Sequence, residues 1–491
     1  MPHINAVKYP SGGAVPPEGT KSSRQDGIDP LVIRVAAVVF LGPFMTQLDS
    51  TVVNVAIPAI RQQFQSAITA AQWIIGGYLL ALALMLPLNG WLVNRVGAKR
   101  LYLWCFSAFT LASLLCGTAR TMNGLIFDRA IQGIAGGLLA PMAQMMMARV
   151  SGRHLARVMG YTTVPILIAP ILGPVVAGAI LKYAGWRWLF YLNLPIGILA
   201  VVLAAVLLPD DEDTASKRPF DFPGFLVISP ALVCLLYGME NVLRPNGALV
   251  LLAGLILLGV FIRHALREGD AALIDLHLFG NHIFSTAAIT QFLSNGVAYS
   301  GQFLVPLFLI TGCGLSPAKA GWLLAPMGLG MMCSLPFMGY LTDRFGCRAV
   351  SSAGALMAFL GTLPFLWMAQ NHFLPLLAAA GMFIRGAGQS GIGIPSVSAA
   401  YASVPKKKLG FATTAINIVQ RLGGPLATSV TAIIIALSTV HFSAVGPRSF
   451  TAAFVLLLGL YALVLWSASR LPARIHQTVE TDIDSELSQI E

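Results

Sequence analysis

Apolar stretches long enough to cross a lipid bilayer follow one another along almost the whole sequence. A transmembrane helix needs about 20 mainly apolar residues, because each residue advances the helix by about 1.5 Å. Hydrophobic residues make up 56% of the 491 residues and charged residues only 10%, which leaves no stretch that could fold as a sizeable soluble domain. Since only helices and closed barrels satisfy their backbone in lipid, these runs predict an all-α polytopic membrane protein.

We expect about fourteen spans, joined by short polar loops. They lie near residues 32–56, 70–93, 101–118, 123–147, 158–181, 189–208, 222–240, 248–267, 283–310, 317–341, 349–368, 373–401, 410–437 and 450–469. The sharpest polar break is the segment 209–221, PDDEDTASKRPFD, which we expect to separate two helical bundles. Both ends of the chain, 1–30 and 470–491, are polar and are predicted to be flexible tails.

Basic residues gather on one set of alternate loops, with a bias of about three to one. Such loops lie on the cytoplasmic side, so we expect both termini to be cytoplasmic and the number of spans to be even. The formal charge of +11 then follows from topology, and nucleic acid is excluded as a partner. The six cysteines show no CxxC spacing, so we expect neither a metal nor another cofactor.

The segment GWLVNRVGAKR at residues 90–100 has a second copy, GYLTDRFGCR, at residues 339–348. Each copy lies between two apolar runs, where glycines allow a tight turn and basic residues hold the loop at the anionic cytoplasmic face. Copies about 250 residues apart indicate a duplicated membrane bundle. We assign gating positions to both copies: Gly90, Arg95, Gly97, Gly339, Asp343 and Arg344.

The predicted fifth span is unusually rich in proline and glycine. Proline removes backbone hydrogen bonds and bends a helix, while glycine allows close helix packing. These features favour a hinge or gate over a merely irregular packing surface. The gate or hinge residues assigned to this span are Pro170, Gly173, Pro174 and Gly178.

Two opposite charges lie deep within apolar runs at similar predicted depths. Asp49 and Arg129 are each roughly 10 Å below the outer surface, so they can meet if the first and fourth spans are neighbours. A carboxylate at this depth, beside an arginine, is typical of a proton-binding site, with a fixed structural ion pair as the alternative. We include Asp128, nearer the end of the span, in the predicted proton-coupling group.

Two further arginines, Arg385 and Arg421, lie near the middle of the twelfth and thirteenth spans. No carboxylate in the second half lies at their depth, so their partners are carbonyls, water, a ligand, or the nearby Gln389 and Gln420. They predict either contact with an anionic or acceptor-rich substrate or hydrogen bonds between helices.

The ninth span carries polar residues on one helix face. Gln291, Asn295, Tyr299 and Gln302 follow spacings of about one helical turn. A polar stripe on a buried helix favours the lining of a water or ligand path, with polar contacts between helices as the alternative.

Five segments together resemble the fourteen-span drug:proton antiporter branch (the EmrB/QacA type) of the major facilitator superfamily. They are LDSTVVNVAIP at 48–58, the loop at 90–100, RAIQGIAGG at 129–137, APILGPVVAG at 169–178 and WRWLFYLNLPIG at 186–197. We place Asn54 and Gln132, within the first and third of these segments, in the predicted substrate cavity. Asn94 stands where the family usually has aspartate, and Ala169 and Ala177 stand where it usually has glycine.

The resemblance implies a major facilitator fold with two six-helix bundles and an inserted helix pair. The expected units are a cytoplasmic tail at 1–30, bundles at 31–208 and 269–469, a cytoplasmic loop at 209–221, the inserted pair at 222–268 and a second tail at 470–491. The implied function is proton-coupled export of small amphipathic compounds by alternating access, in which opening to the outside exposes Asp49 for protonation. The implied partners are a small-molecule substrate, protons and membrane lipid, in a monomer of a bacterial inner membrane, with a periplasmic adaptor protein left open.

Two other functions remain open at this stage. One is uptake of a metabolite by proton symport. The other is a membrane-embedded enzyme that binds Mg²⁺ through the acidic run at 210–213, although a solvated loop is the favoured explanation of that run. We expect no enzyme activity, and a sensor is disfavoured because no soluble signalling domain is present.

Overall fold

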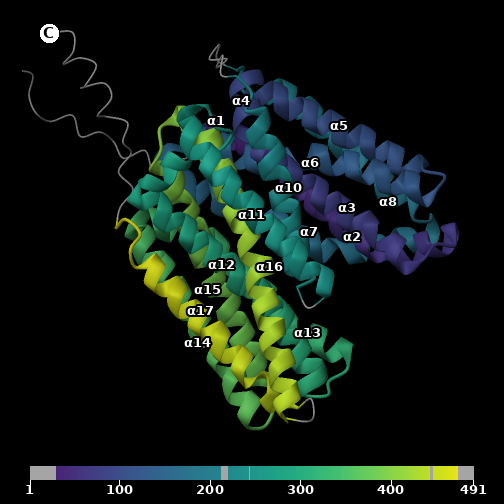
Figure 1. Ribbon diagram of the computed structural model, residues 1–491, viewed down its shortest axis with the longest axis vertical. Coiled ribbons are helices and arrows are strands. Elements are labelled where there is room, and N and C mark those ends of the chain that lie inside the picture. The colour runs from purple at the N-terminus through teal and green to yellow at the C-terminus, as the bar shows by residue number, and fades with distance from the viewer. Residues whose placement is uncertain (1–28, 212–218, 243, 443–445, 474–491) are drawn as a thin grey trace, which may run out of the picture.

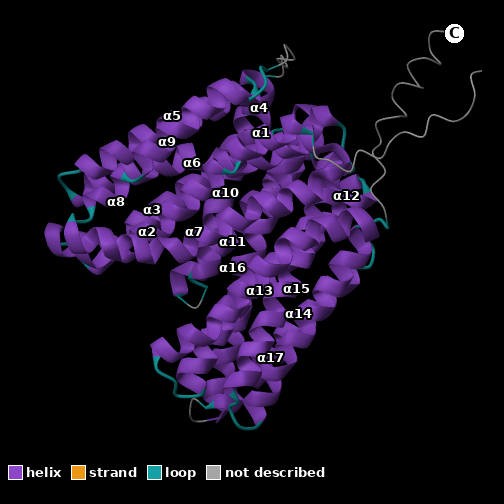
Figure 2. Ribbon diagram, turned by 180° about the vertical axis from the view of Figure 1, so that it is seen from behind, coloured by secondary structure: helices purple, strands orange, loops and turns teal. Residues whose placement is uncertain are grey.

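The computed structural model describes residues 29–211, 219–242, 244–442 and 446–473, and the described chain is helical, without strands (Figures 1 and 2). The predicted terminal tails therefore lie almost entirely outside the described residues. The α-helices are α1 (Pro30–Val39), α2 (Leu41–Phe64), α3 (Ile68–Met85), α4 (Asn89–Val96), α5 (Ala98–Thr118), α6 (Met122–Ser151), α7 (Leu155–Tyr183), α8 (Arg187–Tyr191), α9 (Asn193–Leu207), α10 (Phe222–Glu240), α11 (Pro245–Glu268), α12 (His282–Leu307), α13 (Pro317–Phe345), α14 (Cys347–Gln370), α15 (Pro375–Ala402), α16 (Leu409–Phe442) and α17 (Thr451–Ala468).

Thirteen helices in the described part of the chain are long and apolar enough to cross a membrane. They include α1 and α2 together as one span, α3 with α4, and α8 with α9. The one predicted span not among these thirteen is the twelfth, at 373–401, which corresponds to α15, whose Arg385, glycines and serines lower its mean hydropathy. It nevertheless packs between α13 and α14, and most of its residues are buried. The chain is a multi-pass membrane protein of all-α fold.

The helices that face outward carry large apolar side chains, as a lipid-facing surface requires. Trp322, Leu376 and Val206 are among the most exposed of these. Inside, the first bundle packs α2 on α7, α3 on α6 and α5 on α6 and α9, and the second packs α12 on α16 and α15 on α13 and α14. The pair α10–α11 packs on itself, and α10 touches both α3 and α16. The inserted pair thus bridges the two bundles on one side.

The two bundles converge at one end and diverge at the other (Figures 1 and 2). The converging end carries the two repeated loops and the basic run Lys406–Lys408, and we call it the basic face. The second glycine of each repeat, Gly97 and Gly346, has a φ of +97° and +86°, a backbone conformation that side chains other than glycine rarely adopt. Both turns between helices therefore depend on glycine.

The first glycine of each repeat lies where one bundle touches the other. A Cβ on Gly90 of α4 would lie 3.1 Å from the Gly410 carbonyl of α16, and one on Gly339 of α13 would lie 2.4 Å from the Arg157 Cα of α7. Backbones can approach this closely only without a side chain between them. The repeated loops thus hold the two bundles together at the basic face.

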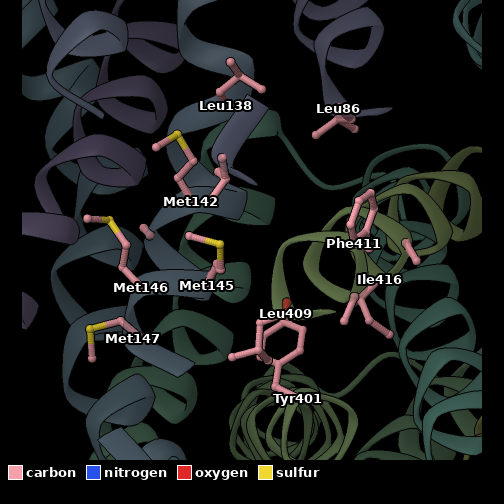
Figure 3. Packing of buried hydrophobic residues seen from close by; sticks show 14 of the residues in the cluster. Leu86, Leu138, Met142, Met145, Met146, Met147, Tyr401, Leu409, Phe411 and Ile416 are labelled. Carbon is pink, nitrogen blue, oxygen red and sulfur yellow. The ribbon is translucent and has the colours of Figure 1, made fainter. Parts of the chain in front are cut away.

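Methionines fill the same contact zone from the α6 side. Figure 3 shows Met142, Met145, Met146 and Met147 on α6, across from α15 and α16 side chains that include Tyr401 and Phe411. Methionine is flexible and polarisable, so it fits irregular surfaces and repacks readily. This packing suits a contact that must form and separate.

Candidate functional site

A buried carboxylate joins four helices of the first bundle. The Asp49 side chain on α2 is 0% exposed and forms an ion pair with Arg129 on α6, with 2.5 Å between Oδ2 and Nη1. Its Oδ1 accepts hydrogen bonds from the amides of Asn193 on α9, at 2.7 Å, and Gln132 on α6, at 3.1 Å. Both amides also donate to the Ser113 hydroxyl on α5. Three donors on one carboxylate form the arrangement that its ionised state requires.

Arg129 links this network to the rest of the bundle. Its Nε donates to the Ile74 carbonyl at 3.3 Å, and its guanidinium carbon lies 4.1 Å from the centre of the Tyr78 ring. The Phe190 ring lies farther away, at 5.8 Å. A cation held against an aromatic face is stabilised, most strongly when it is desolvated. Tyr78 is therefore in direct contact with the buried ion pair.

A central cavity of about 1100 Å³ lies on the other side of Tyr78. Its walls come from α2, α3, α6 and α7 of the first bundle, α10 of the inserted pair and α12 and α16 of the second bundle. The lining combines apolar groups such as Leu79 and Ile166 with polar ones such as Gln47 and Thr163. A mixed lining of this size suits a small amphipathic ligand.

Hydrogen bonds across the two bundles close the cavity toward the basic face. Gln144 of α6 accepts from the Tyr401 hydroxyl at 2.9 Å and from the Asn417 amide at 2.8 Å. Nearer that face, the Gly90 backbone N–H donates to the Thr414 hydroxyl at 3.1 Å. At the opposite ends of the helices the lining includes Trp73 and Arg244. The structure is therefore closed at the basic face and open at the opposite face.

The second repeat contributes an ion pair to this closure. Asp343 at the end of α13 lies 3.2 Å from the Arg157 Nε on α7 and 3.6 Å from the His154 Nδ1. Arg95 and Arg344 are exposed at the basic face. The first repeat has Asn94 in place of an acid, and here Asp211 accepts hydrogen bonds from two backbone N–H groups in the first turn of α5.

Four of the predicted cavity residues line the cavity. They are Asn295, Tyr299, Gln420 and Arg421. The guanidinium of Arg421 makes no hydrogen bond or ion pair within the described residues, so it is free to meet a ligand. The polar stripe on α12 is thus split, with its central residues at the cavity and its ends elsewhere.

Three predicted cavity residues are instead used in contacts between helices. Gln291 donates to the Gly393 carbonyl and the Ser396 hydroxyl, and Gln389 donates to the Ser294 hydroxyl at 2.9 Å. Arg385 is 0% exposed and donates to the Tyr461 hydroxyl at 3.1 Å and to the Val297 carbonyl at 3.2 Å. These residues lie outside the cavity lining, because the helices α12, α15 and α17 enclose them.

Four more predicted residues are placed differently from the prediction. Asn54 and Gln302 are exposed outside the cavity lining, and Gln132 belongs to the Asp49 network rather than to the lining. Asp128 is half-buried on α6 and makes no contact with Asp49 or Arg129 in the described structure. Residues next to each other on a helix point in different directions, which explains why Asp128 is left out of the network.

Asp49 is not exposed to the cavity in this conformation, and its exposure on opening to the outside stays a prediction. The cavity is open at the face opposite the basic one, yet the Asp49 side chain is completely buried behind Tyr78. The burial follows from the network itself, because Asn193 and Gln132 occupy one carboxylate oxygen and Arg129 the other. Access of water to Asp49 requires a movement of Tyr78 or of this network.

The predicted hinge residues lie along α7. Gly173 packs against α2, where a Cβ would lie 2.2 Å from the Thr51 hydroxyl. Pro174 and Gly178 are exposed, and Pro170 lies within the same helix. Gly173 therefore fixes a close helix contact in this conformation.

Several residues of the site were not found from the sequence. Asn193 and Ser113 complete the Asp49 network, Tyr78 forms its wall, and Gln144 and Asn417 close the cavity floor. Each is a single polar or aromatic residue in an apolar run, which is the only signal the sequence offers for it. Which neighbour it meets depends on how the helices pack sideways.

The acidic run that could have held Mg²⁺ is partly described. Asp210 pairs with Lys99 at 2.8 Å, which lowers the pKa of Asp210, and Asp211 caps α5. Residues 212 and 213 lie outside the described chain. Among the described residues, no group of three or more His, Cys, Asp or Glu side chains could hold a metal ion.

Comparison with known proteins identifies relatives over most of the chain. The sequence profile of the Major Facilitator Superfamily matches residues 39–428 and again 287–479. The Multidrug resistance protein B homolog of Mycobacterium tuberculosis (strain ATCC 25618 / H37Rv) is 33% identical over 434 residues, which cover 87% of this chain and 80% of that protein.

Solved structures share the fold at low sequence identity. The human organic anion transporter MFSD10 (TETRAN) aligns with a TM-score of 0.62 at 16% identity, covering 90% of this chain and all of that one. The proton:xylose symporter XylE aligns with a TM-score of 0.64 at 16% identity, covering 92% of this chain and 98% of that one.

Proposed function

The chain belongs to the major facilitator superfamily, and from that premise we propose that it is a proton-coupled antiporter that exports small amphipathic compounds. The name of its Mycobacterium tuberculosis relative supports a role in multidrug efflux. The observation that carries the proposal is the buried Asp49–Arg129 pair, separated from the central cavity by the Tyr78 ring. One site can hold a proton and the other a substrate, and Tyr78 contacts both of them.

The geometry supports coupling through two direct connections. Ser50, next to Asp49 on α2, lines the cavity, and Tyr78 touches both the cavity and Arg129. Protonation of Asp49 would remove the ion pair and leave its carboxyl group facing donors from Gln132 and Asn193. The four helices joined by this network would then change their contacts, and with them the walls of the cavity.

The topology that we infer assigns this conformation a place in the proposed export cycle. The basic face lies in the cytoplasm by the distribution of basic loops, so this conformation is open to the outside. In the exporting cycle, Asp49 takes a proton from the outside, and the substrate binds from the cytoplasm as that proton leaves. The protein works as a monomer in the bacterial inner membrane, where its substrate enters from the cytoplasm or the lipid.

The test uses purified protein in liposomes with an acidic interior. An antiporter accumulates an amphipathic fluorescent dye inside as protons leave, whereas a symporter under the same gradient drives the dye out. Asp49→Asn is expected to abolish accumulation while the protein stays folded in the membrane. Asp128→Asn is the matched control, because this acid adjoins Arg129 but lies outside the network. Full accumulation by Asp49→Asn would remove Asp49 from the mechanism.

A further inference from the structure

Among the residues that the structure describes, the only carboxylate in the cavity lining belongs to the inserted helix pair. Three charged residues line the cavity: Arg421 of α16, Glu240 at the end of α10, and Arg244 in the turn that follows α10. Asp49, the acid of the proposed proton site, is sealed off from this lining. Glu240 therefore has a position that the proton-coupling mechanism does not use.

The Glu240 carboxylate is available to a ligand. It accepts no hydrogen bond and forms no ion pair within the described chain, and Arg244 is not paired with it. It is also the last residue of α10, where the free carbonyls of the helix create a negative potential. A negative side chain at the negative end of a helix is unfavourable until a cation arrives.

Aromatic groups lie on the same side of the cavity. Tyr237 lies one helical turn before Glu240 and lines the cavity with it. Trp73 lines it from α3, whose Leu84 carbonyl accepts a hydrogen bond from the Ser229 hydroxyl of α10. Trp73 and Glu240 are each eleven residues from that contact, toward the outer ends of the two helices. Aromatic faces attract organic cations, so a carboxylate with tyrosine and tryptophan nearby is a suitable environment for an ammonium group.

Glu240 and Arg421 lie at different depths. The Ser429 hydroxyl of α16 donates to the Met239 carbonyl of α10, which places Glu240 near the level of Ser429. Arg421 is eight residues before Ser429 on α16, a separation of roughly 12 Å along the helix. The cavity thus presents a negative group near its mouth and a positive group near its floor.

We propose that Glu240 is the binding subsite for the cationic end of an elongated amphipathic substrate whose acceptor-rich or anionic end faces Arg421. This inference rests on the proposed export function and names the substrate class of the same cavity. It assigns the inserted helix pair a part in substrate selection. The apolar middle of such a molecule would lie along the groups between the two charges, such as Leu79 and Tyr299.

Three probes with one scaffold test the subsite. Dansylcadaverine is cationic, its N-acetyl form is neutral, and dansyl-6-aminohexanoate is anionic, with chains of nearly the same length. We expect Glu240→Gln to weaken binding of the cation about tenfold and to leave binding of the neutral probe unchanged. Binding is measured by fluorescence titration of the purified full-length protein, and transport by KM and kcat in liposomes.

The matched control is Glu268→Gln, because Glu268 is the last residue of α11 in the same pair, is exposed and lies outside the cavity lining. Glu240→Asp should restore most of the affinity for the cation. Unchanged binding of the cation by Glu240→Gln would overturn the inference, and so would equal losses for all three probes. Wild-type protein that binds the probes as expected but shows no gradient-driven transport would contradict the export function instead.

Discussion

At the scale of single residues, the site depends on how a buried charge is satisfied. The Asp49 carboxylate accepts from Arg129, Gln132 and Asn193, so its burial is offset by an ion pair and two amide donors. Removing one partner of a buried pair costs about 3–5 kcal/mol, because an uncompensated charge remains. Protonation of Asp49 has a similar effect, because it leaves Arg129 charged and without its partner, and this is how a proton could change the contacts between these helices.

When no substrate is bound, Tyr78 is expected to prevent protons in the cavity from reaching Asp49. Its hydroxyl is buried and makes no hydrogen bond in the described structure, so the ring is the part that matters. Tyr78→Phe should retain transport and coupling. Tyr78→Ala should open a water-filled path between the cavity and Asp49, through which protons leak. The measurement is acidification of liposomes under a proton gradient without substrate. A Tyr78→Ala variant that does not leak protons would show that another group seals the site.

The two intramembrane arginines of the second bundle are expected to behave differently. Arg421 lines the cavity, so Arg421→Ala should weaken binding of an anionic probe about tenfold and of a neutral probe little. Arg385 holds Tyr461 and Val297, so Arg385→Ala should lower stability by about 1 kcal/mol for each lost hydrogen bond and affect all probes equally. Titrations and thermal unfolding measure both effects. Equal losses for anionic and neutral probes in Arg421→Ala would assign Arg421 a structural role.

At the scale of elements, the two repeated loops are held by different acids in different ways. In the second repeat, Asp343 pairs with Arg157 of the other bundle. In the first repeat, Asn94 has no carboxylate that could form such an ion pair. Asp211, from the segment after α9, instead caps α5 beside Gly97. A Cβ on Gly97 would lie 2.3 Å from that carboxylate, so the glycine provides both the turn and the room.

Asp211 is therefore expected to stabilise the first loop. Asp211→Ala removes the acceptor for the backbone N–H groups of Lys99 and Arg100 and should cost about 1 kcal/mol, the usual loss for a helix cap. Asp210→Ala is the control, because Asp210 is exposed and pairs only with the Lys99 side chain. Thermal unfolding in detergent compares the two variants. A larger loss for Asp210→Ala would contradict the capping role.

The sequence predicted where the helices lie along the chain better than it predicted which helices pack together. Hydropathy placed the helices, because a membrane span can be recognised from the length of its apolar run. Depth along a helix brought Asp49 and Arg129 to the same level, where they meet. The partners Asn193 and Ser113 could not be predicted, because the lateral order of helices is set by packing and not by hydropathy. The same limit misplaced Arg385, which is as deep as a cavity residue but faces α12 and α17.

At the scale of the whole molecule, the two bundles touch at the basic face and separate toward the opposite one (Figure 1). Backbone contacts at Gly90 and Gly339 and the methionines of α6 form that closure. The inserted helix pair bridges the bundles through α10, so any rocking of the bundles also moves Glu240. Substrate selection and the conformational cycle therefore involve the same wall of the cavity.

The central claim is that substrate and proton exclude each other through Asp49, and proton release on substrate binding tests it most directly. Purified protein in weakly buffered solution is mixed with a transported probe, and the pH is recorded without any membrane gradient. The wild type is expected to release protons in proportion to the probe bound, and Asp49→Asn to release none while still binding the probe. Proton uptake by the wild type, or equal release by Asp49→Asn, would contradict the account.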